Sequence, residues 1–173
     1  IGASFARNKG EVICINCDGG IMINLQELQT VSHHQLPIKI FIFNNEGYLM
    51  IKHTQKSMLK GLYTAVDEKS GVSCPDFSRI SFAFNIPYFA INTWDDCRSV
   101  IPEIQDTNGP IICEISMDPE QYFYPKLSLA VNNEGALVSP PIEDLSPLLS
   151  REILKREMIV GIHPKSESLN NDL

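Results

Sequence analysis

The sequence predicts an α/β fold: a doubly wound, mainly parallel sheet flanked by helices, followed by an irregular, proline-rich C-terminal tail. Segments of helical period separate four apolar, strand-like runs, at residues 11–17, 37–44, 88–92 and 111–117. With 173 residues the chain is long enough for one such domain. We therefore divide it into a domain, 1–125, and an extension, 126–173, that wraps the surface, contains a short helix and is not an independent domain.

The first strand–helix–strand unit has the length of a βαβ motif, about 35 residues. Its helix, 22–34, carries Leu25, Leu28 and Val31 at helical spacing, and 11–17 reads as a buried parallel strand. Residues 1–7 read as the end of a helix whose beginning lies outside the sequence. We therefore expect the domain to be N-terminally incomplete.

Local signals predict the remaining elements. Helices are expected at 76–83, 95–105 and 150–160, opened by Pro75-Asp76, by Thr93 or Asp95, and by Ser150. Between these and the first unit, we expect a loop or short turn at 45–54, a short helical turn at 55–59 and a loop at 61–75. The last ten residues, 164–173, are polar and expected to be frayed.

Composition excludes several classes of partner. The net charge is −7 and no Lys/Arg cluster stands out, which argues against nucleic acid and anionic membranes. No apolar stretch reaches the ~20 residues that a membrane-spanning helix needs. The five cysteines and the lack of a signal-peptide layout indicate a reducing, cytoplasmic setting. The G-x-G-x-x-G of dinucleotide-binding domains is absent after the first strand.

Two short polar motifs follow the first two strands. Asp18-Gly19-Gly20 ends the first, and Asn44-Asn45 ends the second. Because parallel strands end at one edge of a sheet and lie ~4.8 Å apart, Asp18 and Asn45 are expected to meet there and share a hard cation. The glycines would let a phosphate approach backbone N–H groups. By itself Asn44 reads as a strand-end residue that bonds its own loop.

Asp-Gly-Gly followed, 27 positions after Asp18, by Asn45 resembles the thiamin-diphosphate-binding motif. The text around it is similar to the C-terminal cofactor domain of acetolactate-synthase-like enzymes, and the likeness continues in 85–89 and 109–121. The resemblance implies the thiamin-diphosphate-binding fold and a Mg²⁺ ion held by three residues, Asp18, Asn45 and the carbonyl of Gly47. It also implies contacts to the cofactor from Gly19, Gly20, Tyr48, Leu49 and Met50.

The sequence departs from the family pattern at two places. Cys17 stands where the family usually has glycine, and Thr54 stands where acetolactate synthases usually have tryptophan. Beside these, His53 and Met50 are candidates for the substrate pocket.

The resemblance implies a thiamin-diphosphate-dependent lyase or transferase, a carboligase or decarboxylase acting on a 2-oxo acid. No catalytic residue is expected in this chain, because the activating glutamate of the family comes from the N-terminal, pyrimidine-binding domain of a neighbouring subunit. We therefore expect a homo-oligomer, a dimer or tetramer, and no activity from the isolated chain. The alternatives are the small subunit of a split thiamin-diphosphate-dependent decarboxylase and a non-catalytic cofactor-binding or assembly module.

Overall fold

The computed structural model describes residues 1–169 and divides the chain into two compact units, Ile1–Gln121 and Tyr122–Leu173. Each is described by itself below. The predicted boundary at residue 125 and the wrapping role of 126–173 stay predictions.

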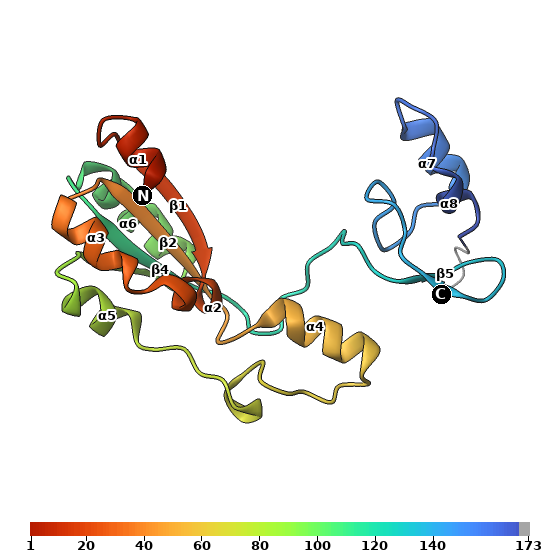
Figure 1. Ribbon diagram of the computed structural model, residues 1–173, viewed down its shortest axis with the longest axis horizontal. Coiled ribbons are helices and arrows are strands. Elements are labelled where there is room, and N and C mark those ends of the chain that lie inside the picture. Colours follow the sequence, from red (N-terminus) through yellow and green to blue (C-terminus); the bar gives the residue numbers. More distant parts are fainter. Residues whose placement is uncertain (170–173) are drawn as a thin grey trace. The chain divides into compact units, whose positions relative to one another are not determined.

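The first unit is built on a four-stranded parallel sheet, which confirms the predicted fold class (Figure 1). The strands lie in the order β1-β2-β4-β3, and they comprise β1 (Val12–Cys17), β2 (Ile38–Asn44), β3 (Tyr88–Ile91) and β4 (Ile111–Ser116). Each agrees with an expected strand to within one residue at either end. Because all four run parallel, the chain leaves every strand at the same edge of the sheet.

Three helical segments pack on one face of the sheet and form the larger core. Their buried side chains, Leu28, Val31 and Phe77, meet alternate residues of the central strands such as Ile40 and Ile112. The segments are α2 (Asp18–Ile21), α3 (Glu27–His34) and α5 (Phe77–Ala83). As expected, Asp76 opens α5: its carboxylate accepts hydrogen bonds from the backbone of Ser78 and Arg79.

The expected helix at 22–34 is wrong in its start and its continuity. Helical turns already begin at Asp18, and a 3₁₀ turn, η1 (Met22–Asn24), separates α2 from α3. Backbone angles at the junctions stay in the right-handed helical region, so the chain keeps winding while its hydrogen-bond pattern tightens.

A single helix, α6 (Trp94–Asp106), covers the opposite face and lies behind the sheet in Figure 1. Thr93 caps it in a capping box with Asp96. Ile104 of α6 packs with Ile91 and Cys113 in a second, smaller core. Helices on both faces make the unit doubly wound, as predicted.

The prediction of a buried strand at 11–17 is wrong for alternate residues of β1. Ile13 and Ile15 are 66% and 69% exposed, and Cys17 is also exposed. Within the described sheet β1 is an edge strand, and α6 packs over β3 rather than over β1. Strand β1 is therefore covered only on the face that packs against α3. Its continuous apolar run would instead suggest that both faces are covered.

Helix α4 (Leu49–Met58) replaces the loop expected over 49–54 and includes most of the short helical turn expected at 55–59, whereas 45–48 forms a loop as expected. Its buried positions are Leu49 and His53, one turn apart, whereas Met50 and Ile51 are more than half exposed. On this helix a polar residue is therefore buried while two apolar residues face solvent, the reverse of the usual arrangement. This inversion explains why the sequence shows no clear helical period there.

The remaining elements of the first unit are short. The chain begins with α1 (Gly2–Ala6), and a 3₁₀ turn, η2 (Glu68–Ser70), lies in the segment after α4. Among the described residues, no helix combines the length and apolar character needed to cross a bilayer.

The second unit contains a two-stranded antiparallel ribbon, which the sequence did not indicate, and two short helices. They are β5 (Ala130–Val131), β6 (Leu137–Val138), α7 (Arg151–Glu157) and α8 (Pro164–Glu167). Arg151 binds the buried carboxylate of Asp144 through both terminal nitrogens, at 2.5 and 2.9 Å. The frayed end expected at 164–173 is wrong for 164–169, because α8 forms there and Leu169 is buried. Residues 170–173 lie outside the described residues.

Candidate functional site

Asp18 lies where β1 ends and is completely buried. Its Oδ1 accepts a hydrogen bond from the backbone N–H of Gly19 at 2.7 Å. Its Oδ2 accepts from the backbone N–H groups of Asn45 at 3.1 Å and Gly47 at 2.9 Å. The structure therefore confirms that the two strand-end motifs meet at one edge of the sheet, and the Asp18 carboxylate joins them.

Asn45 lies beside this carboxylate with an unused acceptor. The residue is 8% exposed, and its side-chain Oδ1 is buried without a hydrogen-bond partner among the described residues. An orphaned buried oxygen is costly unless a ligand or ion completes it. Within residues 1–169, no group of three or more His, Cys, Asp or Glu side chains is arranged to hold a metal. Any cation here would therefore depend on carboxylate, amide and backbone oxygens, the donors that suit Mg²⁺.

Close contacts with two neighbouring side chains explain the glycines of the first motif. A Cβ on Gly19 would lie 2.4 Å from the Tyr48 ring, and one on Gly20 would lie 2.4 Å from Oδ1 of Asn16. Tyr48 therefore packs directly on the Asp-Gly-Gly turn. This contact places the loop after β2 against the turn after β1.

A second network holds the loop that carries Asn45. Nδ2 of Asn44 donates to Glu114 Oε1 at 2.6 Å, and its Oδ1 accepts from the backbone N–H of Glu46 at 3.0 Å. The Tyr88 hydroxyl donates to the other carboxylate oxygen of Glu114 at 2.5 Å. Burial, together with this bond, raises the pKa of Tyr88. The interpretation of Asn44 as a loop-bonding residue is confirmed, and Glu114, to which the sequence assigned no role, braces it.

A cavity of about 510 Å³ opens beside these residues. Of the predicted cofactor residues, Asn45, Gly47 and Leu49 line it. Met50 and His53 are not among its lining residues: Met50 is 57% exposed on α4, and His53 is buried, with 6% of its surface exposed. The substrate-pocket role suggested for these two stays a prediction.

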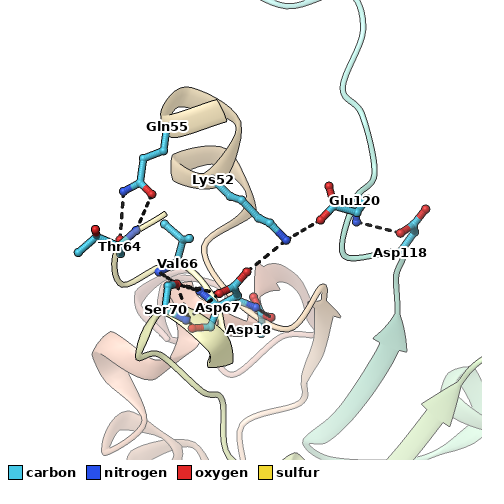
Figure 2. Close-up of polar contacts among 10 residues, drawn as sticks. Asp18, Lys52, Gln55, Thr64, Val66, Asp67, Ser70, Asp118 and Glu120 are labelled. Atoms are coloured by element: carbon cyan, nitrogen blue, oxygen red, sulfur yellow. Dashed lines mark hydrogen bonds and ion pairs between the residues drawn. The ribbon is translucent and has the colours of Figure 1, made fainter. Parts of the chain in front are cut away.

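Lys52 of α4 was missed by the sequence analysis because its segment was read as a loop. Its ammonium lies 2.6 Å from Glu120 Oε1 and 3.3 Å from Asp67 Oδ2, and it lines the cavity with both (Figure 2). The lysine side chain is 13% exposed. Lys52 therefore ties α4 to the segment around η2 and to the chain that follows β4.

The carboxylates in this cluster are shifted toward the charged form. The hydrogen bond from Lys52 lowers the pKa of Glu120, and a bond from the Ser70 hydroxyl, followed by the one from Lys52, lowers the pKa of Asp67. The bond to Glu120, the largest of several effects, raises the pKa of Lys52. A carboxylate whose pKa is lower in the folded protein than in the unfolded chain stabilises the folded protein at pH values above its unfolded-state pKa. This stabilisation is lost as the pH falls through the pKa of the folded protein.

We expect Lys52→Met to lower the thermal unfolding midpoint at pH 7 and to flatten its decline between about pH 5 and pH 3. The pKa of Glu120 should return toward its ordinary value, whereas Asp67 keeps its bonds from Ser70. Thermal unfolding followed by circular dichroism over this pH range measures the effect. Lys69→Met, at an exposed lysine of η2, is the control. Parallel pH profiles of Lys52→Met and the wild type would contradict the expectation.

Cys74 is a further residue that the sequence analysis did not find. Burial, and after it the negative charge of Asp18, raises the pKa of the Cys74 thiol to about 11. Cys74 also lines the cavity with Asn45. No local signal could have shown this, because residue 74 lies in a loop segment 56 positions after Asp18.

Comparison with known proteins agrees with this geometry. The profile of the family "Thiamine pyrophosphate enzyme, C-terminal TPP binding domain" matches residues 1–115. Over 133 residues the chain is 32% identical to an acetolactate synthase large subunit of Pyropia yezoensis, covering 77% of this chain and 22% of that protein. Over 137 residues it is 30% identical to acetolactate synthase isozyme 2 large subunit of Escherichia coli (strain K12), covering 79% of this chain and 24% of that protein.

A solved structure has the same fold. It is the thiamine diphosphate-dependent 4-hydroxybenzoylformate decarboxylase of Rhodococcus jostii RHA1, which superposes with a TM-score of 0.62 at 21% identity over 70% of this chain and 22% of that one. The chain thus spans about a quarter or less of the length of these relatives. With the family profile matching two thirds of its length, the chain belongs to the thiamine pyrophosphate enzymes, in the region of their C-terminal TPP-binding domain.

Proposed function

We propose that this chain binds thiamin diphosphate through a Mg²⁺ ion held by Asp18, Asn45 and the backbone carbonyl of Gly47. One observation carries the proposal. The buried Asp18 carboxylate binds the backbone N–H groups of Asn45 and Gly47, while the buried Asn45 Oδ1 beside it has no partner among the described residues. These residues form an oxygen-rich site that a hard cation would complete.

The other residues of the edge have supporting roles in this proposal. In this proposal the diphosphate contacts the backbone of Gly19 and Gly20, and Tyr48, which packs on Gly19, contacts the cofactor from the loop after β2. Leu49, buried at the start of α4, lines the cavity, and we propose that it contacts the cofactor together with Met50, the next residue of the helix. Asn44 and Glu114 hold the Asn45 loop in place.

The chemistry that thiamin diphosphate supplies when bound is addition to, and decarboxylation of, a 2-oxo acid. We propose that the chain takes part in such a reaction, as a carboligase or decarboxylase similar to acetolactate synthase. The activating glutamate would come from the pyrimidine-binding domain of a neighbouring subunit, so the assembly would be a homo-oligomer. Alone, the chain is expected to bind the cofactor without turning over a 2-oxo acid.

Isothermal titration calorimetry of the purified protein with thiamin diphosphate tests the proposal. We expect binding in the presence of Mg²⁺ and none in EDTA, because the diphosphate needs the cation to meet an acidic site. Thiamin, which lacks the diphosphate, is the control ligand and should not bind measurably. Equal binding with and without Mg²⁺, or no binding in either condition, would contradict the proposal.

A further inference from the structure

The loop that carries Gly47, a residue of the proposed Mg²⁺ site, is paired with a distant segment of the chain. Gly47 forms an antiparallel bridge with Asp67, and the backbone N–H of Tyr48 donates to the carbonyl oxygen of Val66 at 2.8 Å. The N–H of Gly47 donates to Asp18 Oδ2 at 2.9 Å. The position of this loop therefore depends on its pairing with the distant segment as well as on Asp18.

Lys52 anchors the same distant segment to α4. Its ammonium lies 3.3 Å from Asp67 Oδ2 and 2.6 Å from Glu120 Oε1 (Figure 2). The other oxygen of Asp67, Oδ1, accepts hydrogen bonds from the backbone N–H of Ser70 at 3.0 Å and from its hydroxyl at 2.7 Å. Asp67 is thus held through both carboxylate oxygens, to α4 by Lys52 and to η2 by Ser70.

The short distance along the chain between Lys52 and Gly47 links this anchor to the cation site. Helix α4 begins two residues after Gly47, so both residues belong to one continuous stretch. This stretch contacts residues 66–67 through the backbone pairing of the loop and through the ion pair of Lys52. Asn45, Gly47, Lys52 and Asp67 line one cavity. Two attachments so close together leave the loop few alternative conformations.

We propose that Lys52 is a positioning residue that acts through Asp67 to hold the Gly47 carbonyl in place for the Mg²⁺ ion. The inference rests on the proposed function, because it assigns Lys52 a role at the same cation site. In this role Lys52 contacts neither the cation nor the diphosphate. Groups that orient metal ligands in this way contribute about 10- to 100-fold to the affinity for the metal.

A direct bond from Lys52 to the diphosphate is the competing explanation, and Asp67→Asn separates the two. Asparagine keeps an oxygen that can accept the bonds from Ser70 but loses the negative charge that binds Lys52. If Lys52 positions the loop, this change removes its anchor and lowers the affinity for the cofactor. If Lys52 binds the diphosphate itself, loss of a competing carboxylate leaves the affinity unchanged or raises it.

Isothermal titration calorimetry with thiamin diphosphate at a fixed Mg²⁺ concentration tests the proposal. We expect the affinity to fall ~10-fold in both Lys52→Met and Asp67→Asn. Lys52→Arg should recover most of it, because a guanidinium also binds carboxylates. The control is Lys56→Met, the same change of charge at an exposed lysine of α4 that is not among the residues lining the cavity, and it should stay within about twofold of wild type.

Amide hydrogen exchange of the cofactor-free protein gives a second measurement that needs no thiamin diphosphate. The N–H of Tyr48, which is bonded to Val66, should exchange up to about fivefold faster in Lys52→Met and Asp67→Asn, as expected for the loss of one ion pair near the surface. This increase should exceed any change at Ile40 of β2, whose buried position makes it a reporter of global unfolding.

The outcomes separate this inference from the proposed function. Unchanged affinity in Lys52→Met, or unchanged exchange at Tyr48, would overturn the positioning role while Mg²⁺-dependent binding by the wild type stands. Affinity that falls in Lys52→Met but not in Asp67→Asn would also overturn it, in favour of direct contact with the diphosphate. Absence of Mg²⁺-dependent cofactor binding in the wild type would overturn both proposals.

Discussion

Replacing Asp18 by alanine is expected to abolish Mg²⁺-dependent binding of thiamin diphosphate and to destabilise the first unit. Alanine removes the acceptor of three backbone N–H groups, those of Gly19, Asn45 and Gly47. Leaving buried donors without a partner costs ~1–3 kcal/mol each, so we expect the free energy of unfolding to fall by about 3 kcal/mol or more. Urea unfolding and calorimetry measure the two effects.

Two variants separate folding from cation binding at this position. Asp18→Asn keeps one side-chain acceptor but loses the negative charge, so it should retain more stability than alanine while cofactor affinity falls by more than ~100-fold. Asp106→Asn, at an exposed aspartate at the end of α6, makes the same change of charge and should alter neither property. Mg²⁺-dependent binding that survives in Asp18→Asn would contradict the role of Asp18 as a cation ligand.

Replacing Gly47 by alanine is expected to have an effect of similar size, for a steric reason. Gly47 has φ +152°, and a Cβ there would lie 2.2 Å from the backbone carbonyl oxygen of Val66. That oxygen cannot move aside cheaply, because it accepts the hydrogen bond of Tyr48 N at 2.8 Å. Backbone strain and overlap together should lower the free energy of unfolding by about 3 kcal/mol or more. Displacing the loop should also break the Gly47 bond to Asp18 and prevent cofactor binding.

Gly71 offers a matched control for the strain. It also has a positive φ, +105°, but a Cβ there would meet nothing within 4 Å. Gly71→Ala should therefore show only the conformational cost, about 1–3 kcal/mol, and keep Mg²⁺-dependent cofactor binding. Urea unfolding of both variants compares the costs. Equal losses in the two, or cofactor binding retained in Gly47→Ala, would show that the contact with Val66 is not decisive.

The position of the site at one edge of the sheet was predictable, because it depends only on the direction of the strands and on their spacing along the chain. Two apolar runs separated by one helix place Asp18 and Asn45 at the ends of neighbouring parallel strands, whatever the rest of the chain does. The same reasoning failed where burial depends on distant segments. β1 reads as buried on both faces, yet Ile13 and Ile15 are exposed because α6 covers β3 instead.

Helix α4 shows the limit of local periodicity at the site itself. Its apolar residues do not recur at helical spacing along one face. In the structure Met50 and Ile51 are exposed while His53 is buried. Lys52 was consequently overlooked, although it links Asp67 and Glu120 beside the cavity. Its partners lie 15 and 68 positions away, a distance at which no pattern of residues predicts contact.

By itself, the sequence determined the four strands in chain order and the meeting of the Asp-Gly-Gly turn with Asn45, because hydrophobic period and strand direction are local properties. Only the tertiary structure decided which side chains surround that meeting point: Glu114 bonded to Asn44, and Tyr48 packed on Gly19. These contacts join segments up to 70 residues apart, and packing across the edge of the sheet selects them.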